Sequence, residues 1–188
     1  MRIISGTARG RTIVAPAGDR TRPTQDKVRE SLFNIIRWDV QEARVLDLFA
    51  GTGALSLEAI SRGAKDAVLI DMDRDACNAI RKNMETSRLG AQCRLIARDY
   101  RQAMDALARE GQKFDVVFID PPYKMENTGD MCAELFDKGL LSDSFLIVVE
   151  HRRGMAPLLD LRFEAFDLRK YGDTEITFVR SANREETP

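Results

Sequence analysis

The sequence predicts an α/β protein with one main core, whose sheet is mostly parallel and covered by helices on both faces. Two observations carry this prediction. From residue 44 onward, short apolar runs alternate with amphipathic segments of helical period. The run at 114–119 is almost continuously apolar, as in a strand buried between two layers of helices. A chain of 188 residues provides one full core with a small appendage but is too short for two ordinary domains.

Two short β-prone segments open the chain. Residues 2–5 and 11–15 flank a glycine-bearing loop, which predicts a hairpin. Thr24 then suits an N-cap, and the apolar side chains that follow it recur at helical spacing. A helix is therefore expected over about 24–37.

The alternating part of the chain follows. Its strands are expected at residues 44–49, 67–71, 92–97, 113–120 and 145–150. Its helices are expected at about 54–62, 74–88, 100–110 and 127–138. Parallel neighbours should be joined by right-handed crossovers, since the opposite hand is rare.

The helical period stops after residue 157. Residues 161–169 and 175–180 flank Tyr171-Gly-Asp-Thr174, which predicts two strands meeting at a tight turn and completing the sheet. We expect three parts in sequence: a basic hairpin extension (1–20), the main domain (21–182) and a disordered tail (183–188).

Composition narrows the class of protein. The chain is 44% hydrophobic and 31% charged, as in a globular protein, and no apolar run approaches the roughly 20 residues of a membrane span. The N-terminus has no signal-peptide pattern, and three widely spaced cysteines indicate a reducing, cytoplasmic setting. With His151 as the one histidine and no Cys-x-x-Cys pair, we expect no metal site and a structural role for His151.

Charge is unevenly distributed along the chain. The net charge is −1, but residues 1–29 hold seven basic side chains against two acidic ones, which leaves −6 for the remainder. A basic arm of this kind binds phosphates, although a solvated tail has the same composition.

A glycine loop, Asp47-Leu-Phe-Ala-Gly-Thr-Gly-Ala54, lies where the first strand of the alternating part gives way to a helix. Ligands of open α/β sheets bind at such carboxyl ends, and glycines let the backbone approach them closely. No Gly-Lys-Ser/Thr follows, so the loop is not a P-loop. Ser56 replaces the third glycine of the dinucleotide fingerprint.

Acidic residues end the next two strands. Asp71 lies where a carboxylate accepts hydrogen bonds from ribose hydroxyls, and Asp99 is placed to accept from the exocyclic amine of an adenine. Met72 or Tyr100 would cover the ring. Taken singly, both acids also suit helix N-caps. Together with the glycine loop they predict a nucleoside pocket.

The fourth strand ends in Asp120-Pro121-Pro122-Tyr123. Two prolines remove two N–H donors and stiffen the turn, so its carbonyls and the Asp120 carboxylate act as acceptors. Tyr123 offers a flat face for stacking. This combination suits a planar amino group on a nucleobase, whereas a Pro-Pro that merely ends a strand is the plain alternative.

In this order, the glycine loop, the two acids and Asp-Pro-Pro-Tyr resemble the S-adenosylmethionine-dependent amino methyltransferases. Further segments make the chain similar to the RsmD family, bacterial guanine-N2 methyltransferases of small-subunit ribosomal RNA. These segments are Arg2-Ile-Ile-Ser-Gly6, Thr21-Arg-Pro-Thr24, Val28-Arg-Glu-Ser-Leu-Phe-Asn34, Val45-Leu-Asp-Leu-Phe-Ala-Gly-Thr-Gly-Ala54 and Tyr171-Gly-Asp-Thr174. The resemblance implies a Rossmann-like class I fold with seven strands, the last antiparallel, plus the N-terminal hairpin. At position 71 the family more often carries Glu.

The resemblance also implies a site and a reaction. A methyl group passes directly from S-adenosylmethionine to the N2 amine of a flipped-out guanine in 16S ribosomal RNA or the assembled small subunit. No metal or membrane takes part, and the enzyme should be a monomer. The catalytic residues are expected to be Asp120, Pro121, Pro122 and Tyr123. The cofactor-binding residues are expected to be Thr24, Asp47, Phe49, Gly51, Thr52, Gly53, Asp71, Met72, Asp99 and Tyr100. The RNA-binding residues are expected to be Arg2, Arg9, Arg11, Arg22 and Arg29.

Three other interpretations remain open on the sequence. A DNA adenine-N6 methyltransferase uses the same Asp-Pro-Pro-Tyr turn, but the chain has no separate DNA-recognition domain. A nicotinamide-dependent oxidoreductase is disfavoured by Ser56 and by the absence of a Tyr-x-x-x-Lys pair. A non-catalytic RNA-binding module would use the basic arm alone.

Overall fold

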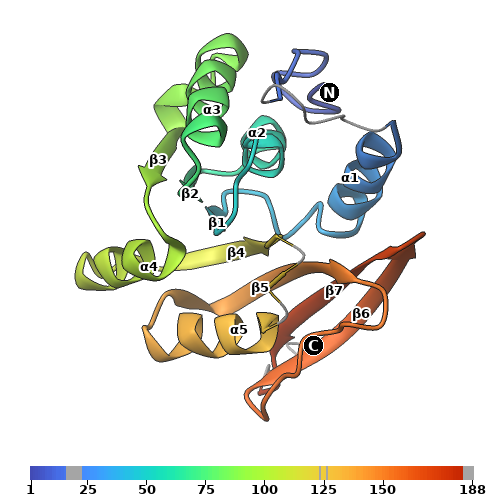
Figure 1. Cartoon of the computed structure of the whole chain (residues 1–188), viewed down its shortest axis with the longest axis vertical. Helices are drawn as coiled ribbons and strands as arrows, with labels where there is room; N and C mark the ends of the chain where they lie inside the picture. The colour runs from blue at the N-terminus through green and yellow to red at the C-terminus, as the bar shows by residue number, and fades with distance from the viewer. Residues whose placement is uncertain (16–22, 123, 126, 184–188) are drawn as a thin grey trace.

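The computed structural model describes residues 1–15, 23–122, 124–125 and 127–183, and of residues 23–25 the backbone. A seven-stranded sheet in the order β3-β2-β1-β4-β5-β7-β6 forms its centre (Figure 1). The strands are β1 Arg44–Asp47, β2 Asp66–Asp71, β3 Cys93–Ala97, β4 Phe114–Ile119, β5 Leu141–Arg152, β6 Phe163–Tyr171 and β7 Thr174–Ser181. The helices are α1 Pro23–Ile35, α2 Ala54–Ser61, α3 Arg74–Ser87, the short 3₁₀ helix η1 Gly90–Gln92, α4 Tyr100–Arg109 and α5 Thr128–Asp137.

The strand directions confirm the predicted fold class. The pairs β1–β2, β1–β4, β2–β3 and β4–β5 are parallel, whereas β7 runs antiparallel to both β5 and β6. β6 and β7 meet at the predicted turn, where Tyr171 pairs with Thr174. Strand order reverses at β1 and β4, so the carboxyl ends of these two strands form the switch point at which such sheets bind ligands.

Two hydrophobic layers cover the sheet, because successive strand residues point to opposite faces. Val45 and Phe118 belong to the layer of α1, α2 and α3. Leu46 and Ile119 belong to the layer of α4 and α5. The near-continuous apolar runs read from the sequence are therefore strands buried on both faces.

The N-terminal segment is an arm packed on α2. It forms the expected hairpin: Arg2 and Thr12 make an antiparallel bridge, flanked by backbone hydrogen bonds from the Ile3 N–H to the Arg11 carbonyl and from the Ile13 N–H to the Met1 carbonyl, both 2.9 Å. Ile3 and Ile13 are buried in the α1–α3 layer. The carboxylate of Glu58, fully buried in α2, accepts the N–H groups of Ile4 at 2.7 Å and Ser5 at 3.0 Å. The arm is thus part of the core structure as well as a carrier of basic side chains.

Strand β5 begins earlier than predicted. Its first residue, Leu141, pairs with Phe114, but the register shifts before Val116 pairs with Leu146. The polar residues within the shift hide the start of the strand from a hydrophobic pattern. Helix α1 ends at Ile35, slightly before the predicted end. Among the described residues, no helix has the length and apolar content needed to cross a membrane.

Candidate active site

The glycine loop leaves β1 at Asp47 and enters α2 at Ala54. Gly51 and Gly53 have φ angles of 55° and 76°, a left-handed backbone that side chains with a Cβ rarely adopt. A Cβ on Gly53 would lie 3.0 Å from Leu69, whereas one on Gly51 would meet no atom within 4 Å. Gly53 therefore serves packing, and Gly51 faces open space in which a ligand can approach the backbone.

Asp71 holds this loop in place. Its Oδ2 accepts the Gly51 N–H at 2.8 Å, and its Oδ1 accepts the Asp73 N–H at 2.9 Å. Each oxygen keeps a second lone pair for a ribose hydroxyl. Met72, next in the chain, is 74% exposed, which leaves its thioether free to cover a ring. The sequence predicted a ligand contact at Asp71 and missed the clamp on the loop.

Asp47 is the buried acid of the site. The Ser56 hydroxyl donates to its Oδ2 at 2.9 Å, while Oδ1 is buried without a hydrogen-bond partner among the described residues. Burial raises the pKa of Asp47 to about 7, and the hydrogen bonds from Ser56 and the Phe49 amide oppose that rise. A buried acceptor without a donor is suited to a cationic or hydrogen-bonding ligand. Ser56, which argued against a dinucleotide loop, supplies the supporting hydroxyl.

Asp99 caps α4, the alternative that the sequence left open. Its Oδ1 accepts the N–H groups of Arg101 at 2.9 Å and Gln102 at 3.5 Å. Tyr100 is 4% exposed and packs against Phe49, with ring centroids 5.1 Å apart. Tyr100 also borders a groove of about 530 Å³ between the starts of α4 and α5. Helix α4, loop residues and α5 provide the rest of its lining: Arg101, Lys124, Met125, Asn127, Gly129, Asp130 and Leu158.

The turn after β4 presents acceptors, as its composition predicts. The Pro122 carbonyl accepts the Met125 N–H at 2.8 Å inside the turn. The Pro121 carbonyl has no hydrogen-bond donor within the described part of the chain. Asp120 keeps an exposed surface at the end of β4. Desolvation by the protein atoms around its carboxylate raises its pKa well above the usual range. The nearby carboxylates of Glu150 and Asp47 raise the pKa of Asp120 further.

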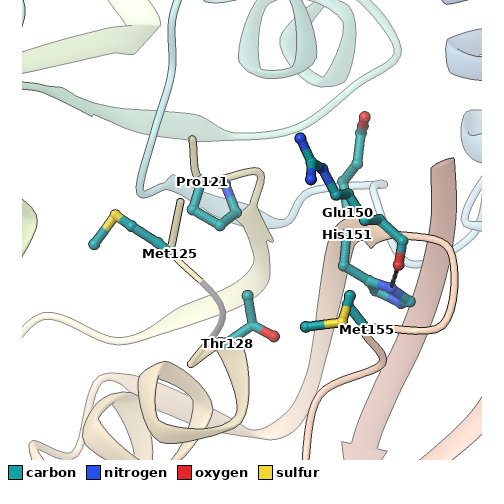
Figure 2. A pocket seen from close by; sticks show the side chains of 7 residues that line it. Pro121, Met125, Thr128, Glu150, His151 and Met155 are labelled. Atoms are coloured by element: carbon teal, nitrogen blue, oxygen red, sulfur yellow. Dashed lines mark hydrogen bonds between the residues drawn. The ribbon is translucent and has the colours of Figure 1, made fainter. Parts of the chain in front are cut away.

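Glu150 is the site residue that sequence reasoning missed. It follows Val149, which pairs with Ile119 in the parallel β4–β5 ladder, so Glu150 lies beside Asp120. Figure 2 shows it at a cavity of about 20 Å³, room for about one water molecule. The cavity is lined by Pro121, Met125, Thr128, Glu150, His151, Arg152 and Met155. The sequence around Glu150 contains no recognisable motif, so the residue was missed. Only the pairing of β4 with β5 shows that it lies beside Asp120.

His151 has a structural role, as expected. Its Nδ1 lies 2.9 Å from the Arg152 carbonyl, and its Nε2 lies 2.7 Å from the Thr177 hydroxyl. The carbonyl accepts a hydrogen bond from Nδ1–H, so in the neutral ring Nε2 accepts a hydrogen bond from the Thr177 hydroxyl. Both ring nitrogens are therefore occupied within the sheet.

The arginines of the N-terminal region divide into exposed and internal ones. Arg2 and Arg9 are exposed and available to phosphates. Arg11 donates to the Ser87 carbonyl at the end of α3. Arg29 is 5% exposed: it donates to the Arg2 carbonyl and to Asp26 at 3.2 Å, and it lies 3.9 Å from Glu58. The predicted phosphate contact is therefore wrong for Arg29, because its guanidinium is used to hold the arm.

Some predicted positions lie outside the described residues. These are Arg22, Tyr123, the side chain of Thr24 and most of the tail at 183–188. Asn83 was not predicted; its amide donates to the carbonyls of Val14 at 2.8 Å and Thr52 at 2.9 Å, joining the arm to the glycine loop. Within the described part of the chain, no cluster of three or more His, Cys, Asp or Glu residues could hold a metal ion.

The fold and the site define a class I S-adenosylmethionine-dependent methyltransferase. The open space above Gly51 fits this cofactor, and so does Asp47 Oδ1, which has no hydrogen-bond partner within the described ranges of the chain. More narrowly, residues 1–180 match the model of the family described as "Conserved hypothetical protein 95", the RsmD family, and the chain belongs to it.

Individual relatives agree with this assignment. The chain is 42% identical over 150 residues to "Ribosomal RNA small subunit methyltransferase D" of Escherichia coli K12, covering 80% of this chain and 74% of that protein. It is 39% identical over 153 residues to "Putative rRNA methyltransferase YlbH" of Bacillus subtilis, covering 81% and 83%. The solved structure titled "Putative methyltransferase yhhF from Escherichia coli" superposes with a TM-score of 0.83 at 35% identity, covering 98% and 99%.

Proposed function

We propose that this protein methylates the exocyclic N2 amine of a guanine in 16S ribosomal RNA, in the cytoplasm. The observation that carries the proposal is the acceptor-rich turn at the carboxyl end of β4, beside the cofactor loop. It is formed by Asp120 and by the Pro121 carbonyl, which accepts no hydrogen bond from the described residues. The relatives named as small-subunit ribosomal RNA methyltransferases point to the RNA. The substrate is free RNA or the assembled small subunit, and the enzyme acts as a monomer without a metal.

The cofactor half of the site is formed by the ends of β1, β2 and β3. Asp47 Oδ1 is placed for the ammonium of the methionine part, and Asp71 for the ribose hydroxyls. Met72 and the Phe49–Tyr100 pair provide apolar surface for the adenine. Bound S-adenosylmethionine supplies an electrophilic methyl group on its sulfonium.

The substrate half orients the amine. A guanine N2 lone pair is delocalised into the ring and is a poor nucleophile. Hydrogen bonds from the amine to Asp120 and to the Pro121 carbonyl favour a nitrogen whose lone pair points at the methyl group, and they stabilise the positive charge that develops there. Tyr123 stacks on the base, which must leave its helix to reach this turn. The exposed Arg2 and Arg9 contact the phosphates.

The direct test is a transfer assay with methyl-labelled cofactor. Free small-subunit RNA, assembled small subunits and DNA are incubated with the enzyme and digested to nucleosides. We expect label in N2-methylguanosine with the wild type and none with Asp120→Ala, while calorimetry still detects cofactor binding to the variant. Asp143→Ala, an exposed acid early in β5, is the matched control and should retain full activity. Label in N6-methyladenine of DNA, or turnover retained by Asp120→Ala, would sink the proposal.

A further inference from the structure

A second carboxylate stands beside the catalytic turn. In the parallel β4–β5 ladder Ile119 pairs with Val149, so the next residues of the two strands, Asp120 and Glu150, are neighbours. Adjacent strands are about 4.8 Å apart, and residues in register point to the same face of a sheet. The two acids therefore present acceptors side by side at the same edge.

The direction of the Glu150 side chain follows from the pleat. His151 points to the α4–α5 face, where it meets Thr177. Glu150 points to the other face, the face of Phe118 and α1. Figure 2 shows the Glu150 and His151 side chains leaving β5 on opposite sides. Both residues line the cavity together with Pro121.

Within the described part of the chain, the Glu150 carboxylate has neither a hydrogen-bond donor nor an ion-pair partner. The Asp120 carboxylate interacts with it electrostatically, and Arg152, two residues on along β5, lines the same cavity. Burial raises the pKa of Glu150. A partly buried acid of this kind is costly unless a ligand supplies donors.

The edge of guanine supplies two such donors next to each other. Its Watson–Crick edge carries the N2 amine and, adjacent to it, the N1–H. Adenine and cytosine also carry an exocyclic amine, but the neighbouring ring nitrogen is an acceptor in both. Two adjacent carboxylates attract the two adjacent donors of guanine. With adenine or cytosine, one carboxylate would instead face the lone pair of a ring nitrogen.

We propose that Glu150 accepts the N1–H of the target base while Asp120 holds its N2 amine, so that the pair selects guanine from the bases that carry an exocyclic amine. This inference rests on the proposed function and names the residue that sets its base specificity. Glu150 thereby explains why a turn shared with adenine methyltransferases acts on guanine. A correct hydrogen-bond pattern at one base edge is worth a discrimination of about 10- to 100-fold.

The test compares two bases in two enzymes. The methylated guanine is first mapped on the RNA, and the same RNA is then synthesised with 2-aminopurine at that position, reconstituted into subunits if the free RNA is not a substrate. 2-Aminopurine keeps the N2 amine but has an acceptor at N1. The wild type should prefer guanine in kcat/KM by about 10- to 100-fold. In Glu150→Gln the side-chain amide donates to N1 of 2-aminopurine, so the preference should shrink at least about tenfold.

The ratio of kcat/KM for the guanine and 2-aminopurine substrates distinguishes a role of Glu150 in base selection from a role in folding. A role in folding alone would lower both rates together and leave the preference unchanged, which would overturn the inference. Glu164→Gln, an exposed glutamate paired with Arg180 at 3.0 Å, is the matched control and should keep the wild-type preference. If Glu150→Gln does not fold, Glu150→Asp keeps the acceptor and must retain a preference for guanine. A wild type that labels no guanine N2 would instead refute the proposed function.

Discussion

The two halves of the site differ in how their polar groups are satisfied. In the cofactor half the acids are tied to the protein: Asp71 clamps the glycine loop, Asp99 caps α4 and Asp47 is held by Ser56. In the substrate half, Glu150 and the Pro121 carbonyl have no donors among the described residues. The cofactor half is largely preorganised by its own hydrogen bonds and leaves Asp47 Oδ1 as an acceptor without a donor among the described residues. The substrate half has its main acceptors in this state.

The largest effect should come from Asp120→Asn, in the substrate half. The amide retains one acceptor but turns an N–H donor toward the amine, and we expect kcat to fall about 10²- to 10³-fold. Cofactor affinity should stay within about twofold of the wild type, since the change leaves the glycine loop intact. Single-turnover kinetics and calorimetry measure the two quantities. An equal loss of kcat and of cofactor affinity would contradict the assignment of Asp120 to the substrate half alone.

Asp71→Asn should produce the opposite pattern. Its amide group would face either the Gly51 or the Asp73 N–H, so one hydrogen bond on the loop is lost. We expect a loss of about 1–2 kcal/mol, or roughly five- to thirtyfold, in cofactor affinity, with kcat at saturating cofactor close to that of the wild type. Asp73→Ala, which removes the helix cap that accepts the Ala76 N–H at 2.8 Å, is the control. This variant should lower the melting temperature of the protein without weakening its binding of the cofactor.

The pKa of Asp47, about 7, gives the cofactor half a pH dependence. Above that pH the carboxylate is ionised and attracts the cofactor's ammonium; below it the acid is neutral. Affinity should therefore fall with decreasing pH, by up to about tenfold per unit below the pKa. The raised pKa also means that the contribution of the protonated acid to folding stability is lost as pH rises through about 7. Calorimetry between about pH 5.5 and 8.5 should show a flat profile for Asp47→Asn.

The smallest effect concerns the arm. Arg9 is exposed, so Arg9→Gln should weaken RNA binding a few-fold and reduce the slope of log affinity against log salt by about one. Arg29 is internal, so Arg29→Gln should lower the melting temperature and leave the salt slope unchanged. A changed salt slope in Arg29→Gln would show that Arg29 contacts RNA phosphates after all.

The order of the elements was predictable from the sequence because buried parallel strands and their covering helices have distinct periods. The glycine loop and the Asp-Pro-Pro turn were predictable because each occupies a strand end. Three features were not predictable, because each depends on a contact between residues separated in the sequence. They are the hydrogen bond from Gly51 to Asp71, the hydrogen bond from Ser56 to Asp47, and the position of Glu150 beside Asp120. The cluster of basic residues in the sequence predicted that Arg29 contacts RNA, but a sequence does not show that its side chain is buried.

The carboxylate of Glu58 has a practical consequence for engineering this protein. It is fully buried, and the arm supplies two of its donors, the amides of Ile4 and Ser5. Deleting residues 2–15 would strip both amides from this acid and uncover the apolar surface that Ile3 and Ile13 occupy. A shortened protein would then lose RNA binding simply because it unfolds. Substitutions confined to the exposed side chains of the arm separate recognition from folding.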